Sequence, residues 1–226
     1  MNNYICVSCL QENRIEKELF ENKDVLECTL CNSKYKIVNA RPILLGKKSV
    51  ELKEMANNSL MQCNYKAKQR IFEKPGYVWD KHMFPKLNKR DLQWRSLRSK
   101  TIEMVEKINA MGVLNTKILD IGAGNSRYGM LPFNSKTQYW STDLAFTNTD
   151  DPPESLDFIS TADALPVASD TFDFAFNFAV LEHVTNPSKC LEEMHRVLVP
   201  GGKAFLIFPL VRPEHMIIRD SPAFGL

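Results

Sequence analysis

Residues 118–124 read ILDIGAG and join an apolar strand to a glycine-containing loop. A largely apolar run suits a strand of a parallel sheet, because helices cover both faces of such a sheet. Ligands bind outside the carboxyl ends of the strands in open α/β sheets, where glycines let a ligand approach the backbone. A Gly-x-Gly alone also fits nucleotide and dinucleotide sites. The run therefore indicates an α/β domain with a ligand site in the loop after residue 121.

Apolar strands alternate with helical segments through residues 111–226. Strands are expected at residues 117–121, 138–142, 172–177 and 203–208, with a helix at 187–198 and a turn at 200–202. This alternation predicts a doubly wound, Rossmann-like parallel sheet with right-handed crossovers. Only 17 residues follow Pro209, too few for another helix and two more strands. Either the sheet is truncated after its fifth strand or the chain is a fragment.

Two Cys-x-x-Cys pairs, Cys6 with Cys9 and Cys28 with Cys31, lie near the N-terminus. Each pair is expected at a tight turn between short strands, so that four thiolates converge on one ion. Four free thiols without metal are the alternative, but two pairs at this spacing favour zinc. Four thiolates leave no open coordination position, so such an ion is structural and not catalytic. Residues 1–46 are therefore predicted to form a small Cys₄ zinc ribbon.

A basic, helical segment follows the cysteine pairs and is predicted to form a linker or lid over residues 47–110. Residues 47–100 hold 14 Lys and Arg but 5 Asp and Glu, whereas residues 101–226 hold 9 and 16. Aromatic residues among these cations suit single-stranded RNA, but the simpler interpretation is a solvated face or a surface docked on the acidic domain. RNA thus remains one candidate partner.

No stretch approaches the ~18 apolar residues that a membrane span needs, and the N-terminus lacks a basic region followed by an apolar one. The sequence therefore predicts a cytoplasmic protein that is not inserted in a membrane. Its oligomeric state cannot be read from these features.

Two later carboxylates extend the pattern that begins at residue 118. Asp143 ends the second strand, where it can accept hydrogen bonds from ribose hydroxyls, and Asp163 precedes Ala164 and a Leu-Pro pair. A buried strand then runs into the loop at residues 178–184. With the LVPGG run at 198–202, these features resemble the class I S-adenosylmethionine-dependent methyltransferases, in particular their type 11 branch.

This resemblance implies a doubly wound fold, S-adenosylmethionine as cofactor, and a set of cofactor-binding positions. Those positions are Asp120, Gly122, Ala123, Gly124, Asp143, Asp163, Ala164 and Phe178. The glycine loop and the region of Phe178 would contact the methionine part, Asp143 the ribose, and Asp163 with Ala164 the adenine. Asp120 could equally cap loop amides. His183 is a weak candidate for a general base, and a structural role suits it better.

The cysteine pairs, followed by YKIVNARPIL at residues 35–44, resemble a zinc-ribbon family that activates methyltransferases. The resemblances together imply methyl transfer to a small molecule, an envelope precursor or RNA. A catalytically inactive scaffold that binds a partner is the alternative. Because the thiolates lie far from the Gly122 loop in sequence, the zinc and cofactor sites are expected to be energetically separable.

Overall fold

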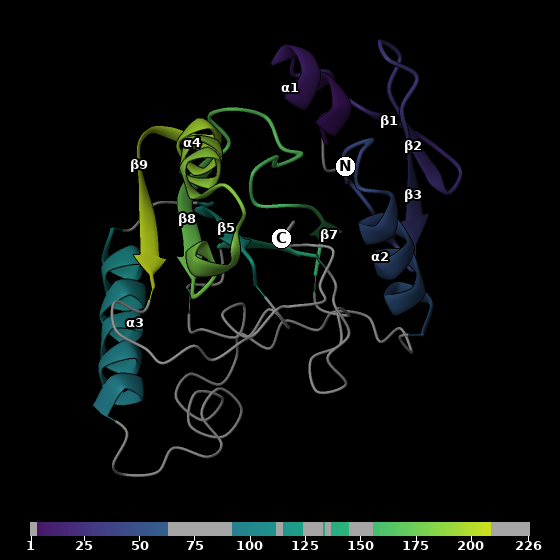
Figure 1. Ribbon diagram of the computed structural model, residues 1–226. Helices are drawn as coiled ribbons and strands as arrows, with labels where there is room; N and C mark the ends of the chain where they lie inside the picture. The colour runs from purple at the N-terminus through teal and green to yellow at the C-terminus, as the bar shows by residue number, and fades with distance from the viewer. Residues whose placement is uncertain are drawn as a thin grey trace.

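The computed structural model describes residues 4–62, 92–111, 115–123, 133, 137–144 and 156–208. These residues form two sheets, one antiparallel and one parallel (Figure 1). The antiparallel sheet has the order β1-β2-β3-β4, and the parallel sheet has the order β7-β6-β5-β8-β9. The N-terminal sheet lies beyond β7, at the opposite end of the parallel sheet from β9.

The parallel sheet confirms the predicted doubly wound α/β architecture. Its strands are β5 (Lys117–Ile121), β6 (Gln138–Asp143), β7 (Phe158–Ile159), β8 (Phe172–Phe178) and β9 (Leu198–Ile207). Strands β5, β6 and β7 progress toward one edge of the sheet, and β8 and β9 progress toward the other. The order therefore reverses between β5 and β8, and open α/β sheets bind ligands at such a switch point.

Helices pack on both faces of this sheet. Helix α3 (Leu92–Ala110) buries Met104, Val105 and Ile108 against aromatic residues of β8. Helix α4 (Pro187–Val197) buries Cys190, Met194 and Val197 on the other face. The α4 helix begins with a cap, because the Asn186 side chain accepts a hydrogen bond from Lys189 N–H at 3.0 Å. From Phe174 to Phe178 the residues of β8 alternate between the two helical layers, whereas Phe172, which precedes a register irregularity, belongs to the α4 cluster.

The N-terminal module contains helix α1 (Val7–Asn13) and strands β1 (Phe20–Asn22), β2 (Val25–Glu27), β3 (Lys34–Val38) and β4 (Arg41–Pro42). The second cysteine pair lies at the turn between β2 and β3, as predicted. The first pair differs from the prediction, because Cys6 caps α1 and Cys9 lies within it. The Cys6 sulfur accepts a hydrogen bond from Cys9 N–H at 3.5 Å, so the helix cap and the first knuckle coincide.

The N-terminal module and the parallel sheet share one hydrophobic core. The chain after β4 runs parallel to β7, where Leu44 N–H donates to Ile159 O at 2.8 Å. Tyr4 pairs with Val167, and Tyr4, Leu26 and Tyr35 belong to the same buried cluster as Leu119, Phe158 and Phe172. The boundary at residue 46 remains a prediction. Because the two parts share this core, we expect their folding to be coupled. This differs from the expectation that the zinc and cofactor sites are energetically separable.

Two helices occupy described parts of the predicted linker, α2 (Val50–Gln62) and α3. Residues 63–91 of this predicted linker lie outside the described residues. Strand β9 begins at Leu198 and not at Lys203, because the 200–202 run forms an irregularity within the strand instead of a turn before it. None of the helices in the described ranges is long and apolar enough to cross a membrane.

Candidate functional site

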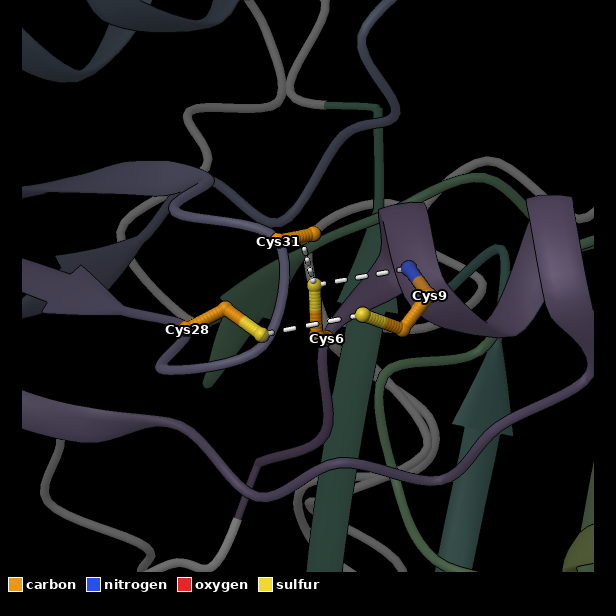
Figure 2. Close-up of side chains that lie close together, drawn as sticks. All are labelled: Cys6, Cys9, Cys28 and Cys31. Carbon is orange, nitrogen blue, oxygen red and sulfur yellow. Dashed lines mark hydrogen bonds between the residues drawn. The ribbon is translucent and has the colours of Figure 1, made fainter.

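Four thiols converge between α1 and the β2–β3 turn (Figure 2). The Sγ atoms of Cys6, Cys9, Cys28 and Cys31 all lie within 4.8 Å of one another. Cys6 Sγ lies 3.5 Å from Cys31 Sγ, and Cys9 Sγ lies 3.6 Å from Cys28 Sγ. Bonds of about 2.3 Å to a tetrahedral zinc ion would separate sulfur atoms by about 3.8 Å. The donors and their spacing therefore fit one tetrahedral metal ion.

Polar groups of β3 and its turn surround these thiols. Tyr35 Oη accepts a hydrogen bond from Ser8 N–H at 3.0 Å and lies 3.2 Å from Cys6 Sγ. Burial is the main cause that raises the pKa of the Cys6 thiol. Burial also opposes ionisation of Cys31, but hydrogen bonds with Ser33 outweigh it and lower that pKa to about 6. Tyr35 thus ties β3 to the α1 side of the thiol cluster.

The carboxyl edge of the parallel sheet brings together the loops after β5, β6 and β8. Gly122 N–H and Ala123 N–H both donate to Thr142 O, at 2.9 and 3.0 Å. Gly122 has a φ of +74°, and a Cβ there would lie 2.3 Å from Val180 Cγ2. The loop after β8 therefore packs directly on the glycine. These contacts place Gly122 and Ala123 at the switch point of the sheet.

Asp120 and Asp143 lie on neighbouring strands at this edge. Asp120 is buried, and its carboxylate accepts a hydrogen bond from the Tyr139 hydroxyl. The sequence left two roles open for Asp120, contact with a cofactor and capping of loop amides. The hydrogen bond from Tyr139 adds a third interaction to these two. Asp143 accepts a hydrogen bond from Leu144 N–H at 2.6 Å. Because Ile121 pairs with Thr142, Asp143 lies beside the Gly122 loop, as a ribose contact at this edge would require.

Asp163 and Ala164 lie in the loop after β7, the next strand along the sheet. Ala164 is buried and its N–H donates to Thr161 O at 3.4 Å. Burial raises the pKa of Cys190 on α4 to about 11, and the Asp163 carboxylate adds to this shift. Asp163 therefore lies near α4. The predicted adenine loop and the predicted ribose contact follow adjacent strands.

Arg196 of α4 fixes the backbone of this loop. Its guanidinium donates to Leu165 O and Val167 O, each at 2.8 Å. It also pairs with Glu193 at 2.7 Å and with Glu16 of the N-terminal module at 2.9 Å. Glu193 in turn accepts a hydrogen bond from Leu165 N–H at 2.9 Å. One cation thus connects α4, the loop and the N-terminal module.

The N-terminal module also contacts the loop directly. Ile5 N–H donates to Pro166 O at 3.0 Å, and the Glu16 carboxylate accepts from Ser169 N–H at 3.1 Å. Burial opposes ionisation of Glu16, but the hydrogen bonds from Ser169 and the charge of Arg196 outweigh it and lower the Glu16 pKa. No local sequence pattern indicates this network, because its members are far apart in the chain.

Three further predicted positions are Phe178, His183 and Gly124. The Phe178 ring packs 5.2 Å from the Phe176 ring, in the core beneath α3. His183 lies in η4 (Leu181–His183), with its Nε2 atom 3.9 Å from Glu182 Oε1, and this contact assigns it no catalytic role. Gly124 lies outside the described residues.

Asn177 is a buried polar residue at the carboxyl edge that the sequence did not single out as a site. Its Nδ2 atom donates to Cys190 Sγ at 3.8 Å, while its Oδ1 atom has no hydrogen-bond partner in the described part of the chain. A polar residue inside the apolar run at 172–178 was the available signal. Burying an unpaired oxygen is unfavourable, so a ligand or water that donates a hydrogen bond there would stabilise the site.

The similarity to known proteins lies in the part of the chain that forms the parallel sheet and the loops at its carboxyl edge. Residues 119–206 match the methyltransferase domain family. The matched region begins within β5 and ends within β9. It therefore contains the Gly122 loop, Asp143, the loop held by Arg196, and Asn177.

Two curated relatives and one solved structure illustrate the similarity. The chain is 35% identical over 71 residues to a ubiquinone/menaquinone biosynthesis C-methyltransferase of Pseudoalteromonas translucida, and these cover 31% of this chain and 28% of the relative. It is 30% identical over 98 residues to a ubiquinone biosynthesis O-methyltransferase of Parvibaculum lavamentivorans, covering 40% and 39%. An arsenic(III) S-adenosylmethionine methyltransferase of Chlamydomonas reinhardtii is 19% identical, with a TM-score of 0.36 and coverage of 42% and 39%. The chain thus spans well under half the length of each relative.

Replacing Gly122 with Ala is expected to destabilise the parallel-sheet domain by about 2–3 kcal/mol, because strain at positive φ adds to the collision with Val180. Gly201 is the matched control, since its φ is +82° but a Cβ there meets nothing within 4 Å. Gly201→Ala should therefore cost only about 1 kcal/mol. Urea unfolding measures both changes, and equal losses would show that contact with Val180 is unimportant.

Replacing Arg196 with Met is expected to lower the free energy of unfolding by about 3 kcal/mol, because Glu193 would keep a buried charge without its partner. Glu16→Gln removes a more exposed partner and should cost less than about 1 kcal/mol. Because the Glu16 pKa is lowered in the folded state, its contribution is present at neutral pH and is lost as the pH falls through the acid range. Urea unfolding of both variants gives these free energies. If Glu16→Gln lost more stability than Arg196→Met, Arg196 would not be the central residue of this network.

Proposed function

We propose that this chain transfers a methyl group from S-adenosylmethionine to an acceptor bound beside the carboxyl edge of β5. The match of residues 119–206 to the methyltransferase domain family carries the proposal. The structure supports it by placing the Gly122 loop and Asp143 next to each other at the switch point of the sheet. The acceptor classes that the sequence suggests are a small molecule, an envelope precursor and RNA.

The residues at the edge have distinct proposed roles. The Gly122 loop would contact the methionine part of the cofactor, Asp143 the ribose hydroxyls, and Asp163 with Ala164 the adenine. When bound, the cofactor supplies a methyl group that is already electrophilic. The chain's own task is then to orient the acceptor and exclude water, and no general base is assigned. The Asn177 amide oxygen is available to accept a hydrogen bond at this edge.

The proposed metal is a structural zinc ion held by Cys6, Cys9, Cys28 and Cys31. The spacing of the four sulfur atoms supports this, because all lie within 4.8 Å of one another. Four thiolates complete a tetrahedral shell and leave no position for a water or substrate. The ion would therefore hold α1 to the β2–β3 turn and take no part in methyl transfer.

Transfer of a labelled methyl group tests the proposed reaction. The purified chain is incubated with methyl-tritiated S-adenosylmethionine and an extract of the source organism, and label in acceptor fractions is measured. Label is expected with the original chain and is expected to fall strongly with Asp143→Ala. A folded chain that binds the cofactor and transfers no label would favour the alternative of an inactive, partner-binding scaffold.

A further inference from the structure

A cavity of about 440 Å³ lies between β3 and α2, outside the site described above. Lys34 and Lys36 line it from β3, and Lys53 lines it from α2. Side chains alternate along a strand, so Lys34 and Lys36 share one face of β3 while Tyr35, between them, points toward the thiols. Three cations from two elements thus face one cavity.

Two of these cations lack a carboxylate partner. Lys34 pairs with Glu27 at 3.0 Å. Lys36 and Lys53, in contrast, form no ion pair with any residue that the structure describes. Burial lowers the pKa of Lys53, and no opposite charge in the described part of the chain offsets this effect. Binding an anion between Lys36 and Lys53 would therefore relieve an unfavourable electrostatic environment.

The other lining groups favour a small ligand. Asn57 and Asn58 of α2 add amide groups, and Glu54 contributes the one carboxylate among the lining residues. The aromatic lining residue, Tyr35, is buried, and its hydroxyl is engaged with Ser8, so it offers no exposed ring on which a nucleic-acid base could stack. The cavity volume falls within the range of small-molecule sites.

We propose that this cavity binds the phosphate group of a small phosphorylated ligand, with Lys36 and Lys53 as its main charged contacts. Neither has an acceptor among the residues that the structure describes, and phosphate oxygens bind such ammonium groups strongly. The negative charge of the Glu54 carboxylate repels the phosphate group and so lowers the affinity of the cavity for the ligand. This binding does not depend on methyl transfer.

Titration with ribose 5-phosphate, followed by amide NMR shifts at constant ionic strength, tests the proposal. Saturable shifts are expected at residues 34–36 and 53–58. The double variant Lys36→Gln with Lys53→Gln should weaken binding at least about tenfold, the loss expected for a hydrogen bond to a charged group. Glu54→Gln should strengthen binding. Lys203→Gln, an exposed lysine on the far edge strand β9, is the matched control and should bind like the original chain.

Three results would overturn the proposal. They are an absence of saturable shifts, shifts that persist unchanged in the double variant, and equal weakening in Lys203→Gln. Dispersed amide spectra and unchanged metal content show that each variant is folded. If single-stranded RNA bound through Lys36 and Lys53 while ribose 5-phosphate did not bind, the assignment to a small ligand would be wrong. Cofactor titration of the same samples reports separately on the proposed methyl transfer.

Discussion

Replacing Cys28 with Ser is expected to abolish stoichiometric zinc binding and to unfold the N-terminal module. The substitution removes one of four thiolates, and structural zinc contributes about 10–16 kcal/mol of apparent binding free energy to folding. Because Leu26, Tyr35 and Tyr4 share a core with Leu119 and Phe158, the damage should extend to the parallel sheet. Binding of S-adenosylhomocysteine should weaken as well. Metal analysis and calorimetric titration measure the two losses on one sample.

Cys190→Ser is the matched control, because Cys190 is equally buried but lies outside the thiol cluster. The Cys190→Ser variant should keep its zinc. Its free energy of unfolding should fall only slightly, because it loses the packing of one sulfur atom. If Cys28→Ser lost zinc but bound the cofactor product with unchanged affinity, the two sites would be separable after all. In that case the shared core would contribute little to the shape of the cofactor site.

Replacing Asp143 with Ala is expected to weaken cofactor binding by about 1.5–3 kcal/mol, or roughly 10- to 150-fold, the scale of a hydrogen bond to a charged group. The carboxylate lies at the end of β6, beside the Gly122 loop. Zinc content should not change, since Asp143 is not one of the four clustered thiol residues. Calorimetric titration with S-adenosylhomocysteine gives the affinity.

An exposed acid on α4, Glu192, provides the control for charge. Glu192→Ala removes one negative charge and an exposed pair with Lys189, so cofactor affinity should stay within twofold of the original. Thermal unfolding shows whether either variant is destabilised. An Asp143→Ala variant that remains folded and binds with full affinity would remove Asp143 from the cofactor site.

Much of the parallel sheet was predictable because local patterns and burial agree there. The apolar runs at residues 118–121 and 172–177 form β5 and β8, whose residues pack against helices on both faces. The four cysteines also converge as their spacing predicts. In each case the signal lies within a few neighbouring residues.

Features that depend on long-range packing were not predictable in this way. The first cysteine pair opens a helix, since Cys6 serves as the helix cap and this role competes with the expected strand. The pairing of residues 43–44 with β7 joins segments more than 100 residues apart. Likewise, the loop after β7 is held by Glu16 and Arg196, and neither belongs to any local motif. Three-dimensional proximity alone brings these groups together.

Calorimetric titration of the folded, zinc-loaded chain with S-adenosylmethionine and S-adenosylhomocysteine tests the central claim most directly. The proposed function predicts saturable binding of both with a stoichiometry near one, and weaker binding by Asp143→Ala under the same conditions. If the folded chain releases no heat with either compound and gains no thermal stability from them, it does not bind this cofactor, and the proposed methyl transfer is wrong.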